Sequence, residues 1–189
     1  SRASTVISRE RVGPLIGQSG AVKARIERAF KVDVTVDSHT GVVEITPSNS
    51  GSDPSALLKA RDVVVAIGRG FAPDRAFRLF SEDCVLEVID LEEALGKSDR
   101  DIARVKGRII GSEGKTRRLI EEMSGALISV YGATVSIIGN YEAAFTAREA
   151  VGMLVKGKQH STMYRFLRRR RGEEKKRERL ELWEKPGGQ

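Results

Sequence analysis

The sequence has a single cysteine, Cys84, and lacks any apolar run approaching the length of a transmembrane helix. Cys84 has no disulfide partner and belongs to no CxxC motif, so we expect a reducing compartment. The first residues carry no signal-peptide pattern. These absences together predict a cytoplasmic protein that does not interact with a membrane.

Aromatic residues make up only 5% of the chain, and the two histidines, His39 and His160, lie far apart. The low aromatic content argues against an RRM-type sheet that stacks bases, and no RNP motif is present. The sequence has no cysteine–histidine ligand cluster, and the acidic residues near Asp90 and Asp99 are interpreted as surface charge. We therefore expect neither a metal nor a cofactor.

The formal net charge of +7 is unevenly distributed. From His160 to the C-terminus there are ten Lys or Arg and five Asp or Glu, which leaves 23 against 21 in the rest of the chain. The centre of this basic segment is Arg168, Arg169, Arg170 and Arg171. Such a run favours salt-sensitive, sequence-independent contact with phosphates, although a solvated helix face is the alternative.

The most informative pattern is a GxxG motif that occurs twice, at Gly17–Gly20 and at Gly111–Gly114. A shift of 94 positions also superimposes apolar and acidic residues downstream of the first motif on equivalent residues downstream of the second: Ile26, Glu27, Val34 and Val36 on Ile120, Glu121, Ile128 and Val130. Further along, a shift of 87 aligns the segments that begin at Ala60 and Ala147. Two copies of one module, with loops of unequal length, explain this repetition.

Each GxxG motif predicts close approach of the backbone to a ligand, because glycine has no Cβ. The residues that follow each motif have helical periodicity. A helix that begins there would direct free N–H groups and its positive dipole end at an anion. This arrangement suits a nucleic-acid phosphate, whereas plain turn glycines are the alternative.

The pattern of each module predicts the order β-α-α-β-β-α, with GxxG between the first two helices. In the first module we expect strands at 4–8, at 32–36, where apolar and polar residues alternate, and at 43–45, and a last helix capped by Ser55. In the second module, Ser98 is the candidate N-cap of a helix from Asp99 to about Lys106, and Gly125 is expected to end the helix that follows GxxG. The segment from Pro73 to Phe80 is expected to be a helical connection whose Phe77 and Phe80 dock on one or both modules. The predicted division is 1–71 for the first module, 72–83 for the connection, 84–158 for the second module with a helical insert at 91–106, and 159–189 for a basic helix and tail.

This order resembles the type I KH domain, present twice. The resemblance implies an α+β fold in which each three-stranded antiparallel sheet carries helices on one face, followed by the basic C-terminal helix. The segments 111–125, 128–132, 135–139 and 160–167 are together similar to the archaeal and eukaryotic ribosome-assembly proteins of the partner-of-Nob, or Dim-two, type. That resemblance implies RNA binding near the 3′ end of small-subunit rRNA, cooperation with the Nob endonuclease, and contact with the α subunit of initiation factor two.

For the second module, we expect backbone N–H groups of the GxxG loop to meet phosphates: Gly111, Ser112, Glu113, Gly114 and Lys115. Nearby positive charge would come from Arg108, Lys115, Arg117 and Arg118. Ile109 and Ile110, with Leu119, are candidates for the floor of an apolar groove, and the strand edge from Ile128 to Val130 is a candidate for contacts with bases. Burial in the core is the alternative for these isoleucines.

The second loop departs from the common KH pattern because Glu113 stands between its glycines, where a basic residue is frequent. Glu113 would repel a phosphate unless it points away or pairs with Arg117. The corresponding candidates in the first module are Ile16, Gly17, Gln18, Ser19, Gly20 and Lys23. Fewer cations surround that loop, so we expect the second module to be the main RNA site and the first to bind weakly or to dock a protein.

An enzyme is not expected. Gly114-Lys115-Thr116 resembles the end of a P-loop, but the first glycine of that motif would have to stand at Ile109. The prediction is therefore a non-catalytic RNA-binding adaptor. Two alternatives remain open, namely a scaffold whose KH folds mainly dock proteins, and a general RNA-binding protein without sequence preference.

Overall fold

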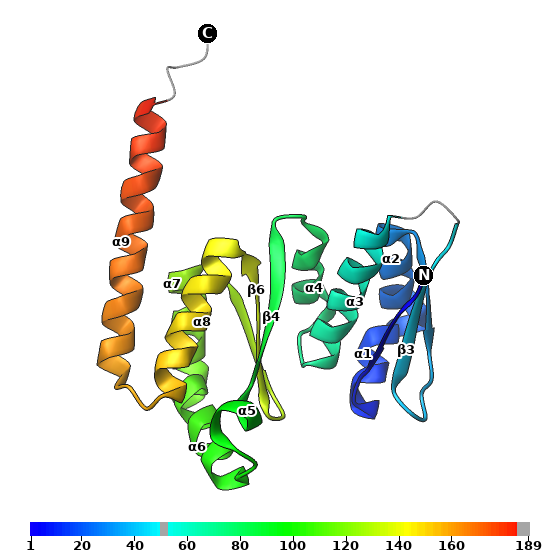
Figure 1. Cartoon of the computed structure of the whole chain (residues 1–189), viewed down its shortest axis with the longest axis horizontal. Coiled ribbons are helices and arrows are strands. Elements are labelled where there is room, and N and C mark those ends of the chain that lie inside the picture. The colour runs from blue at the N-terminus through cyan, green and yellow to red at the C-terminus, as the bar shows by residue number, and fades with distance from the viewer. Residues whose placement is uncertain (50–52, 185–189) are drawn as a thin grey trace. The chain divides into compact units, whose positions relative to one another are not determined.

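The computed structural model describes residues 1–49 and 53–184. Part of the predicted loop between the first hairpin and the next helix, and the last five residues of the predicted tail, lie outside the described residues. The chain forms two compact units, residues 1–90 with 127–141 and residues 91–126 with 142–189 (Figure 1).

The first sheet consists of β1 (Ala3–Val6), β2 (Val32–Val36) and β3 (Val42–Pro47), antiparallel in the order β1-β3-β2. Its strands show the predicted alternation, since Val32 and Val34 are buried whereas Asp33 and Thr35 are exposed. The three predicted strands of the first module are thus present, with small shifts at their ends.

Helices pack against one face of this sheet: α1 (Val12–Ile16), preceded by the 3-10 turn η1 (Arg9–Arg11), then η2 (Gln18–Gly20), α2 (Ala21–Phe30) and α3 (Pro54–Gly68). Leu15, Ile26 and Ile67 are fully buried between the helices and the sheet. Asp53 caps α3 by accepting a hydrogen bond from Ser55 N at 3.0 Å, so the prediction of Ser55 as the cap is wrong. Pro54 explains the shift, because proline needs no N–H partner at the first helical position.

The connecting segment forms α4 (Pro73–Ala76) and η3 (Phe77–Phe80). Phe77 stacks on Phe80 with ring centroids 4.7 Å apart, and Phe80 meets Phe30 edge-on at 5.3 Å. The Arg25 guanidinium lies 4.4 Å from the centre of the Phe77 ring. Since η3 also contacts α3 and two strands of the second sheet, the predicted docking of these aromatics is confirmed.

The second sheet, β4 (Cys84–Asp90), β5 (Leu127–Tyr131) and β6 (Thr134–Asn140), is antiparallel in the order β4-β6-β5. It belongs to the first unit because it packs beside the end of α3, where Ser129 Oγ donates to the Arg69 carbonyl at 2.8 Å. Gly70 permits this approach, since a Cβ there would lie 2.7 Å from Ser129 Oγ. The Tyr131 hydroxyl donates to Glu10, which raises the pKa of Tyr131 above its ordinary value.

The second unit consists of α5 (Leu91–Leu95), α6 (Asp99–Ile110), η4 (Ser112–Gly114), α7 (Lys115–Ser124), α8 (Tyr141–Val155) and α9 (His160–Glu184). Ser98 caps α6 as predicted, accepting from Asp101 N at 3.3 Å. The helix does not stop at Lys106, because the buried stripe Ile102, Val105 and Ile109 keeps helical spacing through Gly107. The predicted insert boundary at 106 therefore lies inside α6.

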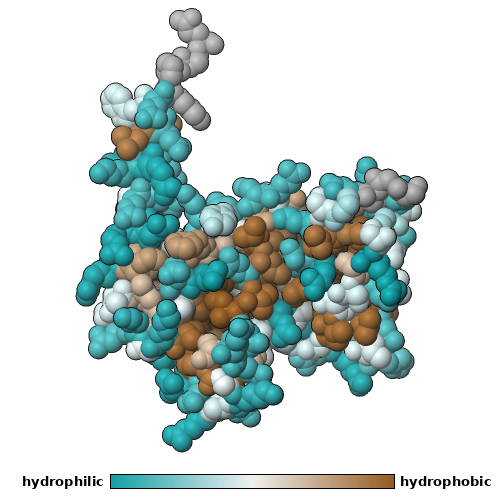
Figure 2. All heavy atoms as spheres, in the orientation of Figure 1, coloured by the Kyte–Doolittle hydropathy of each residue, from teal (hydrophilic) through white to brown (hydrophobic). Residues whose placement is uncertain are grey.

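The C-terminal helix α9 packs on α7 through its first turns, where Met163 and Leu167 are fully buried. Its later turns are exposed and continue without a break through Gly172, and Figure 2 shows this helix as predominantly hydrophilic. Across the described residues, no helix combines the length and apolarity that a membrane span requires. The α+β class, with two three-stranded antiparallel sheets and a C-terminal helix, is confirmed.

Candidate nucleic-acid interface

The two GxxG loops have the same backbone conformation. Gly17 and Gly111 have φ/ψ of 75°/176° and 74°/177°, and Gly20 and Gly114 are left-handed with φ of 76° and 75°. Between the glycines, Ser19 and Glu113 are also left-handed, each with φ 54°. The sequence repeat is therefore a conformational repeat.

The first glycine of each motif is required sterically. A Cβ on Gly111 would lie 2.2 Å from Thr116 Oγ1, and one on Gly17 would lie 2.4 Å from Val22 Cγ2. Its backbone conformation is also one that glycine adopts most readily. As a result, the chain turns tightly into α7 and leaves Ser112 and Glu113 exposed at the tip.

The cations around the second loop differ in what they contact. Lys115 is exposed at the start of α7. Arg117 does not meet Glu113; it pairs one turn along with Glu121, with Nη1 2.8 Å from Oε1. Arg118 Nη1 instead donates to the backbone carbonyl of Glu113 at 2.8 Å and holds the loop in shape. Among these three cations of the described residues, Lys115 has neither an ion pair nor a side-chain hydrogen bond, so its ammonium group is available to an anion.

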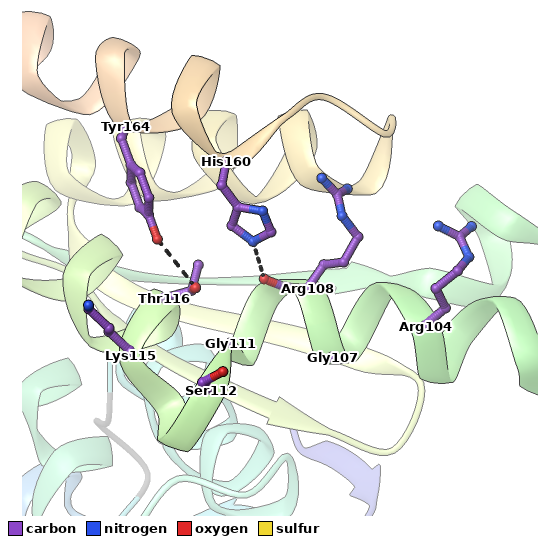
Figure 3. Close-up of a pocket in the computed structure, with 9 residues that line it drawn as sticks. All are labelled: Arg104, Gly107, Arg108, Gly111, Ser112, Lys115, Thr116, His160 and Tyr164. Carbon is purple, nitrogen blue, oxygen red and sulfur yellow. Dashed lines mark hydrogen bonds between the residues drawn. The ribbon is translucent and has the colours of Figure 1, made fainter.

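Arg108, predicted as a phosphate contact, has a structural role. Its guanidinium donates to the carbonyls of Leu154, at 2.5 Å, and Lys158, just past the C-terminus of α8. The Arg108 carbonyl in turn lies 2.9 Å from His160 Nε2 at the start of α9 (Figure 3). The positive charge of Arg108 therefore compensates the C-terminal end of a helix and ties α6, α8 and α9 together beside the loop.

A pocket of about 500 Å³ opens beside the second loop, between α6 and α9 (Figure 3). It contains no acidic side chain; it is lined by Arg104, Gly107, Arg108, Gly111, Ser112, Lys115, Thr116, His160 and Tyr164. Tyr164 Oη lies 3.4 Å from Thr116 Oγ1, which links α9 to the start of α7. The sequence did not single out Arg104, Gly107, Thr116 or Tyr164 for this site; the signals were the four-residue spacing from Arg104 to Arg108 and the spacing from His160 to Tyr164.

The two adjacent isoleucines before the second loop differ in burial. Ile109 is fully buried, so the prediction that it floors a groove is wrong; it continues the inward stripe of α6. Ile110, the next residue, is half-buried and keeps access to the surface. On β5, an edge strand of the second sheet, the side chain of Ile128 is buried and that of Val130 is half-buried.

The first loop has the same shape with little available charge. Gln18 and Ser19 are exposed and Ile16 is half-buried. Lys23 lies 3.9 Å from Glu27, and Arg25 packs on Phe77. Where the second loop has Lys115 and Arg118, the first has Ala21 and Ala24. The expected contrast in charge between the two loops is thus present in the structure.

The four adjacent arginines of α9 have different surroundings. Arg168 and Arg169 are exposed. Arg170 lies 5.6 Å from the centre of the Phe145 ring and 3.7 Å from Glu173, and Arg171 Nη1 is 3.3 Å from Met123 Sδ. Part of the run therefore faces the protein, as the helical geometry predicts, and part faces solvent.

Within residues 1–49 and 53–184, no group of three His, Cys, Asp or Glu side chains is placed to hold a metal ion. Cys84 is buried in β4. Three of the N–H groups predicted to meet phosphates are instead hydrogen-bonded within the chain: Gly111 N donates to the Gly107 carbonyl at 2.8 Å, Gly114 N to the Gly111 carbonyl at 3.2 Å, and Lys115 N to the Ser112 carbonyl. The second loop and its pocket provide an exposed tip at Ser112 and Glu113 and the uncompensated charge of Lys115 and Arg104, which suit an anion-binding surface.

Comparison with known families matches both halves of the chain. Residues 85–172 match a model described as a eukaryotic-type KH domain of type I, that of the second domain of PNO1, and residues 14–83 match the Krr1 KH1 domain. Since KH domains are RNA-binding modules, these matches confirm a non-catalytic RNA-binding protein.

Several known proteins are similar along most of the chain. KH domain-containing protein MJ0443 of Methanocaldococcus jannaschii is 50% identical over 95% of this chain and 78% of its own length. The pre-rRNA-processing protein PNO1 of Phaeosphaeria nodorum is 32% identical over 78% of this chain, which spans only 57% of that relative.

Solved structures agree with these matches. A crystal structure of an Aeropyrum pernix protein of unknown function has a TM-score of 0.91 at 45% identity and covers 97% of both chains. Dim2p of Pyrococcus horikoshii has a TM-score of 0.83 at 46% identity, covering 89% of this chain and 99% of Dim2p. A complex of a/eIF2α, aDim2p and rRNA from the same organism matches with a TM-score of 0.85. This relationship supports an RNA-binding role in rRNA processing, and the chain belongs to the family of two-KH-domain proteins that includes archaeal Dim2p and has PNO1 among its eukaryotic relatives.

Proposed function

We propose that this protein binds near the 3′ end of small-subunit (pre-)rRNA through its second GxxG loop and positions that end for cleavage by a Nob-type endonuclease. The carrying observation is the second GxxG loop, in which Ser112, Glu113 and Lys115 are exposed beside a pocket without acidic side chains. Its relatives named as pre-rRNA-processing proteins, and the solved Dim2p complex that contains rRNA, support this assignment.

A division of labour between the modules is part of the proposal, with boundaries at 1–71, 72–83, 84–158 and 159–189. The second module supplies RNA recognition, and the exposed Arg168 and Arg169 of α9 add sequence-independent attraction. The first module docks protein, because Ala21 and Ala24 replace cations and Arg25 is engaged with Phe77. Because the solved Dim2p complex also contains a/eIF2α, we propose the α subunit of initiation factor two as a partner.

The decisive test places the same negative charge in both loops. Ser112→Asp and Gln18→Asp change equivalent exposed residues, and binding to a short RNA with the small-subunit rRNA 3′ sequence is measured against a scrambled RNA. We expect Ser112→Asp to lower the affinity for the matching RNA by about tenfold or more, and Gln18→Asp to change it less than about twofold, because only the second loop offers charge to a phosphate.

Each competing function has its own outcome in this experiment. Equal loss on both RNAs would indicate a general RNA-binding protein. No loss with Ser112→Asp would instead favour KH folds that mainly dock proteins. The endonuclease step is tested by adding the full chain to a Nob-type enzyme and a pre-rRNA fragment, where we expect faster cleavage at the mature 3′ end and no stimulation by the Ser112→Asp variant.

A further inference from the structure

The pocket between α6 and α9 extends the GxxG site along one side of α6. Arg104 lies at the far end of this pocket from Lys115, and its side chain extends from the same side of α6 as that of Arg108 (Figure 3). A KH module clamps about four nucleotides at the GxxG loop. From Arg104 to Gly111 the helix rises about 10 Å, the length of about two to three stacked nucleotides. Arg104 is therefore within reach of a strand longer than the one that the loop itself clamps.

The charges of this pocket are unequally available. Arg108 is occupied by the carbonyls of Leu154 and Lys158. Arg104 and Lys115, in contrast, have neither an ion pair nor a side-chain hydrogen bond in the part of the chain that the structure describes. Arg104 is exposed, and no acidic side chain lines the pocket to compensate it. Two uncompensated cations thus stand at opposite ends of a cavity that has room for a ligand.

Residues that line the pocket are held by contacts between helices, whereas Arg104 and Lys115 at its ends have no ion pair among the described residues. His160 Nε2 is held at the Arg108 carbonyl, and Tyr164 Oη lies near Thr116 Oγ1. Gly107 leaves the side of α6 open, since a Cβ there would meet nothing within 4 Å. An open pocket whose walls are tied together by these contacts and whose end cations are uncompensated suits a phosphodiester backbone, which carries regularly spaced charge.

The first module lacks this feature. A shift of 94 positions places Glu10 where the second module has Arg104, and Gly13 where it has Gly107. Glu10 accepts a hydrogen bond from Tyr131, so the equivalent position is acidic and occupied. The extension is therefore specific to the second module.

We propose that Arg104 and Lys115 form a phosphate-binding extension of the second GxxG site, in which the RNA backbone continues beyond the four clamped nucleotides along the open pocket that His160 and Tyr164 line. This inference rests on the proposed RNA-binding function. Phosphate is the chemistry that the pocket recognises, and the same RNA strand is its source.

The test uses the full chain, RNAs of about four and about eight nucleotides from the small-subunit rRNA 3′ end, and a salt series. Arg104→Gln is compared with Arg100→Gln, which removes the same charge one turn earlier on α6, from an exposed residue outside the pocket. For the longer RNA we expect Arg104→Gln to lower the affinity about fivefold at about 0.1 M salt and to flatten the slope of log K against log salt by about 0.7, the value for one lost single-strand contact. We expect Arg100→Gln to leave the affinity for both RNAs unchanged, and Arg104→Gln to spare the shorter one.

Several results would overturn the extension. Equal losses for Arg100→Gln and Arg104→Gln would mean diffuse attraction, and an equal loss with the shorter RNA would place Arg104 inside the four-nucleotide clamp. Inorganic phosphate could raise the melting temperature of the original protein but not that of Arg104→Gln, while both bind RNA equally well. That result would mean that the ligand of this pocket is a small phosphate. The Ser112→Asp variant separates the two proposals. If it binds RNA as tightly as the original protein, RNA binding at the loop is refuted. If Ser112→Asp lowers RNA affinity and Arg104→Gln does not, only the extension is refuted.

Discussion

The two GxxG loops have nearly identical backbones and very different surroundings. Gly17 and Gly111 agree within a few degrees, as do Gly20 and Gly114. An ion pair also repeats, since Lys23–Glu27 in the first module corresponds to Arg117–Glu121 in the second. What differs is the charge directed outward. The shape of a KH loop is therefore not evidence of RNA binding by itself, and the uncompensated cations around it decide which loop is suited to a phosphate.

The two modules also share an arginine that donates to backbone carbonyls at the end of the last helix. Arg11 donates to the carbonyls of Ile67, at 2.8 Å, and Phe71, at 2.9 Å. The shift of 87 places these two residues on Leu154 and Lys158, the carbonyls that Arg108 holds in the second module. Each module thus uses one arginine to hold the C-terminal end of its last helix. Arg108 lies on α6, the helix that precedes the second GxxG, whereas Arg11 lies in the 3-10 turn η1 and is the N-cap of α1.

The largest effect is expected from substitutions that disturb the backbone conformation shared by the two GxxG loops. Gly111→Ala and Gly17→Ala each force a Cβ into the next helix, and we expect both to lower the free energy of unfolding by about 2–4 kcal/mol, because a strained backbone adds to a clash. Urea unfolding measures the stability, and RNA binding is measured on the folded fraction. We expect RNA affinity to fall only for Gly111→Ala; an equal fall for Gly17→Ala would contradict the functional difference between the loops. Gly132→Ala, at a hairpin with open space, controls for left-handed strain alone.

An intermediate effect comes from the arginines that close the helix ends. Arg11→Gln and Arg108→Gln each leave carbonyl groups with fewer donors, so we expect losses of about 1–3 kcal/mol in the free energy of unfolding. Thermal and urea unfolding of the two variants provide the comparison. If Arg108 instead contacts RNA directly, its variant will flatten the salt slope of RNA binding by about 0.7 while leaving stability unchanged.

The smallest effect concerns pH. Burial raises the pKa of Asp62 in α3 above its ordinary value of 3.8, whereas Glu149, its counterpart in α8, is exposed. Because the folded state favours the protonated carboxyl, the stability contributed by Asp62 is present below pH 3.8 and is lost as the pH rises through the folded pKa. We therefore expect Asp62→Asn to raise the free energy of unfolding at neutral pH by less than ~1 kcal/mol, the size of a typical point-substitution effect. In acid, where Asp62 is protonated, we expect no such gain.

Unfolding curves from about pH 3 to pH 8 measure this difference, with Glu149→Gln as the matched control. If Asp62→Asn raises the free energy of unfolding by the same amount at every pH, titration of the Asp62 carboxyl does not contribute to the pH dependence of stability.

Much of the architecture could be predicted from local pattern. The alternation of Val32 to Val36 indicated a half-buried strand, the capping residue Ser98 marked the start of α6, and Gly125 marked the end of α7. These signals are local, because a strand face, a helix cap and a left-handed C-cap each depend on neighbouring residues alone. The predicted end of α6 was wrong for the same reason: Gly107 has a weak helical propensity, and burial of Ile109 overrides it.

The duplication, the position of both loops and the excess of positive charge around the second were determined by the sequence itself. Only the tertiary structure decided which cations remain available. Arg108 and Lys115 both carry a positive charge and are close in sequence, yet the first is engaged with the end of α8 and the second is exposed. Arg104 joins the site because α9 returns to α6 from more than fifty residues away. The physical reason is that a charge interacts with whatever the fold brings within a few ångströms, and sequence distance carries no information about that.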